Sequence, residues 1–426
     1  MRVSIPALLL LFAAMAQAQL PVLPGLQGFG VDTPAGRGGA ILRVTNLNAS
    51  GDGSLRAALE TQGPRTILFE VGGVIDLSDS LVIHEPFVTV AGQTAPSPGI
   101  TIVGAGIVVV THDILLQHLR VRVGDRVDGP DPGGRDALGI YGDAETGEGP
   151  YNVVVDHCSF SWAIDEGIST WNAGVRDITI HACISAENLA NSLHPEGEHS
   201  KGFLIGDHTQ RIAVLQNLFA HNTERNPLVK GDVQAVVANN LIYNPRRGTI
   251  HFSDPEGSGP STADIVGNVL ILGPDTFTLF NRFPIVHASF DTKRGSAIFL
   301  QDNAYTPAYS TPLKPAQRSQ ARRAIRATTP SLLGNAITPM DSADIVEHVL
   351  ANAGARPADR DATDIRIVES VTAGTGGIID SQDEVGGFPV ATETRHTLEI
   401  PENPTMDDDG DGYTNLEERL HELGTK

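Results

Sequence analysis

A short motif recurs along the middle of the chain and restricts the folds that it can adopt. The equivalent positions are separated by 25, 35, 23 and 28 residues, at Cys158, Cys183, Leu218, Leu241 and Val269. Short β-branched runs surround them, and glycine, asparagine, aspartate and proline separate these runs. A period in the twenties with loop insertions is typical of a solenoid whose coils each add one strand to several sheets. The repeat therefore predicts an all-β chain folded as a parallel β-helix.

Asparagine precedes the motif residue in the later repeats, at Asn217, Asn240, Asn268 and Asn303. These residues could be isolated turn formers, since asparagine is common in turns. Their regular recurrence instead favours one stacked position, where each amide side chain would bond to the next coil. We therefore expect an amide ladder along one corner of the β-helix.

Helical patterns are confined to the two ends of the repeat region. Ser54 can cap a short helix over residues 55–60, whose apolar residues share one face and could cover the open end of the sheets. Residues 342–353 form an amphipathic pattern that ends at Gly354. Residues 360–389 have a mixed pattern, and we expect them to pack along the outside of the stack.

The N-terminus has the layout of a secretory signal over residues 1–18: a basic start, a short apolar run and small residues before the cleavage point. The apolar run is shorter than the roughly 20 residues that span a bilayer. We therefore expect a secreted, monomeric protein, extracellular or periplasmic, with no membrane segment. In that compartment Cys158 and Cys183 could form a disulfide, or they could be two small buried side chains.

The chain carries 30 Lys and Arg residues against 51 Asp and Glu, a net charge of -21. This excess of negative charge argues against affinity for nucleic acid or for anionic membranes. It also disfavours an acidic substrate unless cations are concentrated locally. An acidic polymer is therefore a candidate only where a basic cluster can be found.

The acidic C-terminal segment, residues 401–426, contains the pattern of an EF-hand calcium loop. Gly412 allows the sharp turn, and the spacing is too specific for a random acidic tail. The expected ligands are Asp407, Asp409, Asp411, Tyr413 through its carbonyl, Asn415 and Glu418. Only one such loop is present, so we expect the ion to hold the C-terminus in place, beside a β-helix domain over residues 19–400.

Unusual polar residues gather in the segments 124–138, 156–166 and 194–207, and two cations follow at Arg225 and Lys230. Long connections of a β-helix can collect on one side and form a groove for an extended polymer. Carboxylates from two successive coils could meet there as oxygen ligands for Ca²⁺, facing the cations of later coils. The alternative is that these acids are ordinary turn residues.

Four runs follow one another along the chain: Asp136-Ala-Leu, Val153-Val-Val-Asp156-His157-Cys-Ser-Phe-Ser, Lys201-Gly-Phe-Leu-Ile-Gly206 and Arg225-Asn-Pro227-Leu-Val-Lys230. In this order they resemble the pectate lyase superfamily, polysaccharide lyase family 1. Residues 28–59 and 378–387 also resemble bacterial secreted members, so that the likeness extends over most of the mature chain. The resemblance implies a right-handed parallel β-helix that cleaves polygalacturonate by Ca²⁺-assisted β-elimination.

The resemblance also implies roles for individual cations. Arg225 matches the catalytic base, and Lys201 lies near the catalytic lysine of the family. Lys230 stands where the family usually has a second arginine, so the charge is kept while the bidentate fork is lost. Arginine is an unusual base, because its reference pKa lies above 12. The resemblance therefore implies that its pKa falls beside the other cations.

For the calcium site, Asp136 matches a calcium-binding aspartate of the family, whose usual partner two residues earlier is Gly134 here. Asp165 and Glu166 lie where the other calcium carboxylates are found. Calcium bridging the substrate carboxylate, aided by Lys201 and Lys230, would offset the charge that builds when the C5 proton leaves.

Two further functions remain open from the residues alone. A glycoside hydrolase would need a carboxylate pair, but Asp165 and Glu166 should point to opposite faces if both lie on one strand. A non-catalytic β-helix could bind glycan without turnover. Formation of an unsaturated product distinguishes a lyase from both, and the substrate could be pectate, methylated pectin or another uronate polymer.

Overall fold

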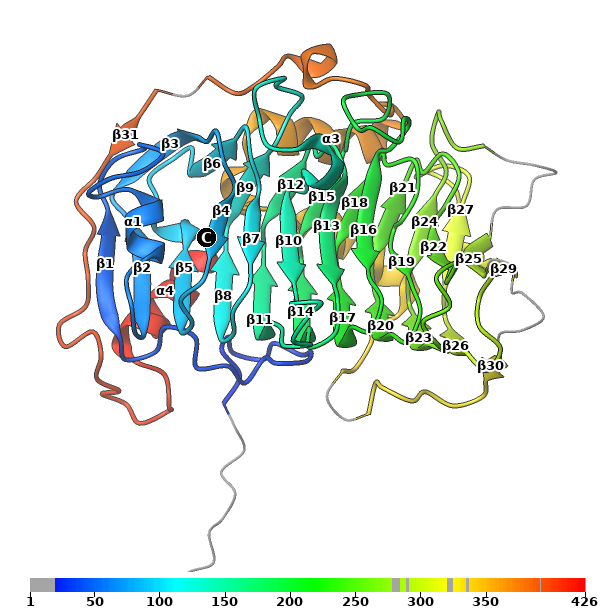
Figure 1. Ribbon diagram of the computed structural model, residues 1–426, viewed down its shortest axis with the longest axis horizontal. Coiled ribbons are helices and arrows are strands. Elements are labelled where there is room, and N and C mark those ends of the chain that lie inside the picture. The colour runs from blue at the N-terminus through cyan, green and yellow to red at the C-terminus, as the bar shows by residue number, and fades with distance from the viewer. Residues whose placement is uncertain are drawn as a thin grey trace, which may run out of the picture.

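The computed structural model describes residues 20–277, 284–288, 291–319, 325–334, 337–390 and 392–425. Within these residues the chain winds through three long sheets that run side by side along one axis (Figure 1). Successive coils pair in parallel and in register, so each strand lies beside its equivalent in the next coil. The predicted parallel β-helix is confirmed, whereas the predicted signal lies outside the described residues.

Each coil passes first through sheet 1, then through sheet 3 and last through sheet 2. Sheet 1 contains β1 (Ala40–Val44), β2 (Arg65–Phe69), β5 (Val88–Ala91), β8 (Ile114–Gln117), β11 (Tyr151–Asp156), β14 (Arg176–His181), β17 (Gln210–Leu215), β20 (Gln234–Ala238), β23 (Thr262–Val266), β26 (Ala297–Gln301) and β30 (Ile325–Ala327). Sheet 2 contains β4 (Leu81–Ile83), β7 (Ile107–Val109), β10 (Leu138–Tyr141), β13 (Glu166–Trp171), β16 (Lys201–Ile205), β19 (Leu228–Val229), β22 (Ile250–Phe252), β25 (Pro284–Ala288) and β29 (Gln317–Ser319). Sheet 3 contains β31 (Thr394–Arg395), β3 (Val71–Asp76), β6 (Ile100–Val103), β9 (Leu119–Arg122), β12 (Ser159–Ser161), β15 (Ile184–Ala186), β18 (Leu218–Ala220), β21 (Leu241–Tyr243), β24 (Val269–Ile271), β27 (Ala304–Thr306) and β28 (Lys314–Pro315), of which β31 and β28 are antiparallel to their neighbours.

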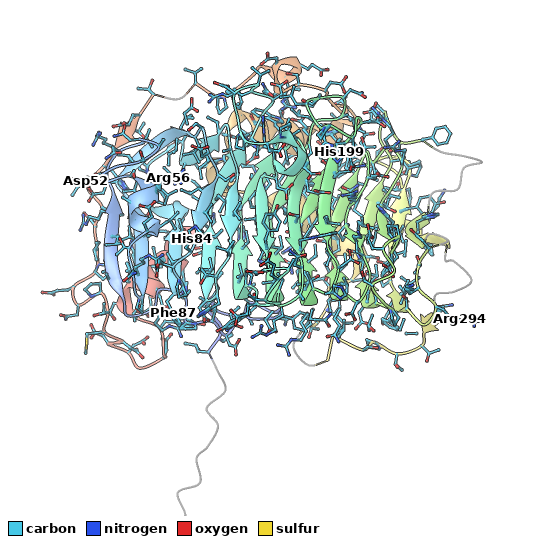
Figure 2. All side chains as sticks on the ribbon, viewed as in Figure 1. Asp52, Arg56, His84, Phe87, His199 and Arg294 are labelled. Atoms are coloured by element: carbon cyan, nitrogen blue, oxygen red, sulfur yellow. The ribbon has the colours of Figure 1, made fainter. Side chains whose placement is uncertain are left out.

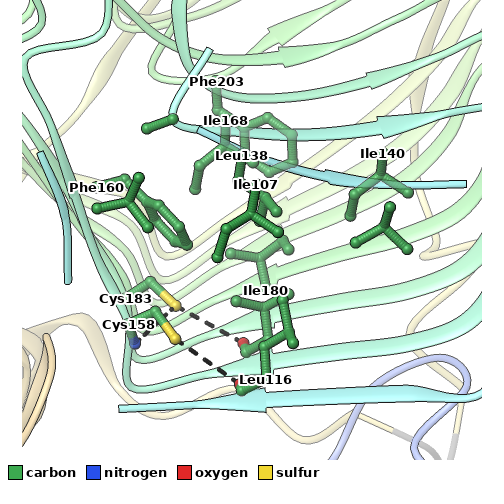
Figure 3. Close-up of a cluster of buried hydrophobic side chains, with 14 of the residues drawn as sticks. Ile107, Leu116, Leu138, Ile140, Cys158, Phe160, Ile168, Ile180, Cys183 and Phe203 are labelled. Atoms are coloured by element: carbon green, nitrogen blue, oxygen red, sulfur yellow. Dashed lines mark hydrogen bonds between the residues drawn. The ribbon is translucent and has the colours of Figure 1, made fainter. Parts of the chain in front are cut away.

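The core is a column of apolar side chains enclosed by the three sheets. Because side chains alternate along a strand, every second residue points into the column, and equivalent residues stack from coil to coil. Figure 3 shows this stacking for Ile107, Leu138, Ile168 and Phe203 of sheet 2, which are all fully buried. Burial of each such side chain contributes about 1.5–3 kcal/mol, so the coils stabilise one another along the whole column.

The predicted amide ladder is confirmed at the corner between sheets 1 and 3. Each asparagine side chain donates to the amide oxygen of the next coil, at 2.9 Å from Asn217 to Asn240, 2.9 Å from Asn240 to Asn268 and 3.0 Å from Asn268 to Asn303. Backbone N–H groups of Asn217, Asn240 and Asn268 bond to the same oxygens. The ladder therefore satisfies buried polar groups that would otherwise destabilise the core.

The two cysteines extend this ladder, which corrects the register that the sequence repeat suggests. The backbone N–H of Cys183 donates to the side-chain oxygen of Asn217 at 2.8 Å, and Ile184 pairs with Leu218. Cys183 is thus equivalent to Asn217, one residue earlier than the repeat predicted. Both cysteines are buried free thiols, and the N–H of Cys158 donates to the sulfur of Cys183 at 3.4 Å (Figure 3).

Replacement of Asn240 with alanine should lower the free energy of unfolding by about 3 kcal/mol, because it leaves several buried partners without hydrogen bonds. Asn240 also donates to the carbonyl of Val214 at 2.8 Å, and the residue is fully buried. Urea denaturation measures the loss. Asn303→Ala is the matched control, since Asn303 lies only partly buried at the end of the ladder and should cost about 1 kcal/mol. Equal losses for the two variants would contradict this account.

The corners of the coil differ greatly in length. Between sheets 1 and 3 most coils turn within one or two residues, with a left-handed backbone at His118, His157 and Gln216; residues 92–99 between β5 and β6 make a longer connection. Between sheets 3 and 2 it makes longer loops, including residues 123–137 and 187–200. The predicted gathering of long connections on one side is therefore present, at the start of the sheet 2 strands.

Helices lie outside the stack. α1 (Leu55–Leu59) begins at the predicted cap Ser54, and its apolar side chains join the end of the core. The pattern over 342–353 becomes a 3₁₀ turn (Ser342–Asp344) followed by α2 (Ile345–Asn352). α2 packs against the outer face of sheet 3 together with α3 (Ala362–Ala373), and α4 (Asn415–Gly424) packs beside β2 and β5 (Figure 1). Short 3₁₀ turns occupy Gly92–Thr94, Pro132–Gly134, Pro357–Asp359 and Gln382–Val385.

Candidate active site

Three carboxylates from two coils meet at the start of sheet 2. Asp136 lies just before β10, and Glu166 is the first residue of β13 in the next coil, preceded by Asp165. The N–H of Glu166 donates to Asp136 Oδ1 at 2.8 Å, which fixes the neighbouring coils at this point. Oxygen atoms of all three residues lie within 4.8 Å of one another. The structure thus brings together the predicted acidic residues of the groove.

The closeness of Asp165 and Glu166 corrects one expectation from the sequence. Adjacent residues within a strand point to opposite faces, and this argued against their acting as a pair. β13 begins only at Glu166, so the alternation does not apply to Asp165, and the two carboxylates converge.

Burial and mutual repulsion raise the pKa of each acid in this triad. The pKa of Asp136 rises to about 7 through burial and the charge of Glu166. The pKa of Glu166 rises to about 8, because burial and Asp165 outweigh the opposing charge of Arg225. Burial and Asp136 raise the pKa of Asp165 to about 6. Such a cluster of hard oxygen donors, short of positive charge, suits a divalent cation such as Ca²⁺.

Hydroxyl donors orient Asp136, one of the two buried acids of the triad. Tyr141 and Ser169 both donate hydrogen bonds to Asp136 Oδ2, while Asp136 Oδ1 accepts from the backbone. At Gly134 an added Cβ atom would meet nothing within 4 Å. Residue 134 therefore contributes no carboxylate, and the oxygen cluster is formed by the three acids of the triad.

The three predicted cations are each paired with a different set of carboxylates. Arg225 forms an ion pair with Glu166 of the triad, and about a quarter of its side chain is exposed, at 25%. Lys201 is nearly buried and is paired with Glu224, which holds the pKa of that acid down at about 2. Glu166, Lys201 and Glu224 are neighbours in register, so opposite charges alternate along this edge of sheet 2.

Lys230 lies at the other end of sheet 2 strands, after β19. Its ammonium group is 3.1 Å from Asp207 and 2.7 Å from Glu256, and it lies 4.7 Å from the centre of the Trp171 ring. Lys230 therefore contacts Trp171, which lines the groove, whereas Arg225 contacts the triad directly.

Two histidines of the 187–200 loop complete the site and were not among the residues assigned from the sequence. His199 Nε2 lies 3.1 Å from Asp165 Oδ1, and His194 Nε2 lies 3.6 Å from the same oxygen. Their rings stack with centroids 3.4 Å apart, and Figure 2 shows where His199 lies above sheet 2. Burial is the main cause that lowers the pKa of both rings, so they are neutral at neutral pH.

The triad, Arg225 and the two histidines line a groove of about 430 Å³. Trp171 lines it at the end of β13, and Tyr141 reaches from the end of β10 back to Asp136 through its hydroxyl. An elongated, partly charged ligand fits this arrangement better than a small apolar one.

The acidic tail forms a compact turn before α4. Carboxylate oxygens of Asp407, Asp409 and Asp411 lie within 4.8 Å of one another. Partial desolvation and the charges of these acids raise the pKa of Glu418 on the first turns of α4. The side chain of Asn415 instead bonds to Asp408 and to backbone carbonyls. The tail thus gathers most of the predicted ligands and directs Asn415 elsewhere.

Contacts of the tail join it to the N-terminal part of the chain. Tyr413 donates its hydroxyl proton to the carbonyl of Pro21 at 2.8 Å, and Glu417 forms an ion pair with Arg37 at 2.8 Å. Leu416 and Leu420 of α4 pack on Leu68 of sheet 1.

The chain resembles fungal proteins along its whole length. It is 34% identical over 436 residues to the probable pectate lyase C of Aspergillus fumigatus, covering 100% of this chain and 93% of the relative. The probable pectate lyase C of Neosartorya fischeri has the same identity and coverage over 435 residues. No family model matches the chain.

Solved structures share the fold at low sequence identity. Pectate lyase II of Xanthomonas campestris is 18% identical with a TM-score of 0.53, covering 79% of this chain and 100% of the other. A pectate lyase variant of Bacillus subtilis is 14% identical with a TM-score of 0.55, over 81% of this chain and 100% of the other.

Proposed function

The chain belongs to the pectate lyase family, and from this premise we propose that it cleaves polygalacturonate, or a related uronate polymer, by calcium-assisted β-elimination. The observation that supports this proposal most directly is the position of Arg225. Its guanidinium is bound to one acid of a three-carboxylate cluster, at the end of a groove that can hold a polymer.

Asp136, Asp165 and Glu166 are the residues that would hold Ca²⁺ in the groove. When bound, the ion would neutralise the carboxylate of the reacting uronate and so favour loss of the adjacent C5 proton. The triad has the oxygen donors and the excess negative charge that such an ion needs.

We assign Arg225 the role of proton acceptor at C5. The electron pair of the C5–H bond then forms a double bond between C4 and C5, the C4–O bond breaks, and the departing oxygen takes a proton from water to become a hydroxyl group of the released chain. Glu166 forms an ion pair with the guanidinium and so orients it. An arginine side chain can accept a proton only when it is deprotonated, so alkaline conditions should favour turnover.

Lys201 and Lys230 supply positive charge for a polyanion on a chain of net charge -21. Lys201 acts beside Arg225, and Lys230 acts at the far end of the groove. Local cations of this kind attract an acidic substrate despite the negative total charge.

An assay of ultraviolet absorbance tests the proposal, because β-elimination creates an unsaturated product. Polygalacturonate, methylated pectin and other uronate polymers should be compared, each with calcium and with a chelator. We expect product from polygalacturonate with calcium and loss of product with chelator. Hydrolysis without an absorbance rise, or binding without any product, would exclude a lyase.

We also propose a second, structural calcium site in the tail, built by Asp407, Asp409, Asp411, the carbonyl of Tyr413 and Glu418. The clustered carboxylates and the nearby start of α4 support it. This site would hold the C-terminus against the N-terminal coils. We further propose that the protein is secreted and acts as a monomer; within the described residues no helix is long and apolar enough to cross a membrane.

A further inference from the structure

Two aromatic side chains from the ends of neighbouring strands lie over the surface of sheet 2; Tyr141 reaches back to Asp136, whereas Trp171 stays at the far end of the groove. Tyr141 ends β10 and Trp171 ends β13, and the two are neighbours in register. Each ring lies over a glycine, Tyr141 over Gly139 and Trp171 over Gly206, because a Cβ atom at either glycine would overlap the ring. Sheet 2 is therefore bare of side chains where the rings rest on it.

Lys230 contacts the indole from two coils further along the chain. Trp171, Gly206 and Lys230 occupy equivalent positions of three successive coils. The ammonium group lies 4.7 Å from the indole centre and is itself held by Asp207 and Glu256. A cation at this distance from an indole stabilises its position. Trp171 is thus held in one place before any ligand binds.

Trp171 nevertheless remains partly exposed and lines the groove. The second tryptophan of the chain, Trp162, is only 1% exposed and packs near Phe388. Trp171 is therefore a partly exposed indole that rests on Gly206 and lines a groove, and aromatic side chains placed in this way are typical of ligand sites.

We propose that Trp171 is a stacking subsite for a sugar ring of the polymer, at the end of the groove opposite the acid triad. This inference rests on the proposed function. The faces of a sugar ring carry C–H groups, which pack on the apolar face of an indole, while the hydroxyl groups at the rim stay in water. Lys230 is a positioning residue that acts through Trp171.

The spacing of the two ends explains what such a subsite contributes. Glu166 and Trp171 begin and end β13, which at about 3.3 Å per residue places their backbones about 16 Å apart. A polymer must therefore extend along the strand to reach both ends. Trp171 would contact the polymer far from the bond that breaks. The subsite therefore strengthens binding and favours polymers that are long enough to reach it.

Kinetics with polygalacturonate provide the first test. Trp171→Ala should raise KM about tenfold and leave kcat within about twofold, whereas Trp171→Phe should retain most of the affinity. Gly206→Ala should reproduce the rise in KM, because the added methyl group displaces the indole while keeping it in the chain. Tyr151→Ala is the matched control, since its ring stacks on His112 outside the groove, and it should leave KM unchanged. Thermal unfolding confirms that each variant is folded.

Intrinsic fluorescence provides a readout that does not depend on turnover. In an Arg225→Lys background, titration with polygalacturonate should change the tryptophan emission, and the added change Trp171→Phe should abolish that signal while calorimetry still detects binding. Binding detected by calorimetry without an emission change, or an unchanged KM in Trp171→Ala beside normal product formation, would overturn the stacking subsite alone. Absence of both binding and product in the unmodified protein would overturn the proposed function and the subsite with it.

Discussion

Replacement of Arg225 with lysine should lower turnover on polygalacturonate by about 10²- to 10⁴-fold, the usual contribution of a positioned general base. Lysine keeps the positive charge beside Glu166 but lacks the planar fork that places a nitrogen at the reacting proton. The fold should be unaffected, because the ion pair can be re-formed and the side chain is partly exposed, at 25%. Initial rates of unsaturated product formation measure the effect, and the thermal midpoint should stay within a few degrees.

Arg176→Lys is the matched control for this prediction. Arg176 begins β14 on the surface of sheet 1, and its side chain is 46% exposed and remote from the triad. It should retain full activity. Turnover of Arg225→Lys within about twofold of the unmodified protein would remove Arg225 from the role of base.

Calcium binding to the groove should strengthen on the order of a thousandfold between pH 6 and pH 8.5, because the ion must displace protons from the triad. The pKa is about 7 for Asp136 and about 8 for Glu166, so both acids are largely protonated at pH 6 without metal and largely ionised at pH 8.5. Calorimetry in buffers of different ionisation enthalpy measures the affinity and the protons released. An affinity that does not change with pH would contradict the assigned ligands.

Stability without metal should change in the opposite direction. In the unfolded chain these acids ionise near pH 4, so at pH 6 the folded protein holds protons that the unfolded chain has released. Their stabilising contribution is therefore present at low pH and is lost as the pH rises through about 7 and 8. In chelator the thermal midpoint should fall over this range, and Asp136→Asn should reduce the fall. Added calcium should restore the midpoint.

A variant of the tail separates the two proposed calcium sites. Asp409→Asn removes one acid from the tail cluster, which lies beside α4 rather than in the groove. It should abolish one class of calcium site and lower the thermal midpoint, while the pH dependence of the groove site stays the same. Unchanged calcium stoichiometry in this variant would exclude the tail site.

The repeat and the amide ladder could be predicted from the sequence because both depend on residues that recur at the same place in every coil. Asn217, Asn240, Asn268 and Asn303 carry this signal directly. The register at Cys183 was displaced by one residue, since a thiol in place of an amide removed the marker that aligns the later coils. α3 was missed as a distinct helix, although Ile367 and Val371 have helical spacing on its buried face.

The acids of the groove were predicted, whereas several of their neighbours were not. His194 and His199 belong to a long loop without periodicity, and only the closed fold brings both rings to Asp165. Trp171 depends on Gly206 from the following coil, a contact between residues that are distant in sequence. Chemistry of this kind is set by the register of coils, which local sequence patterns do not specify.

The unequal corners of the coil have a consequence for how such a protein can diversify. The one- or two-residue turns between sheets 1 and 3 hold adjacent coils at a fixed offset, because their left-handed residues leave little freedom. Segments inserted between sheets 3 and 2 project outward and do not alter that offset. Replacing the whole 123–137 or 187–200 loop can therefore change substrate preference while the supporting coils keep their arrangement.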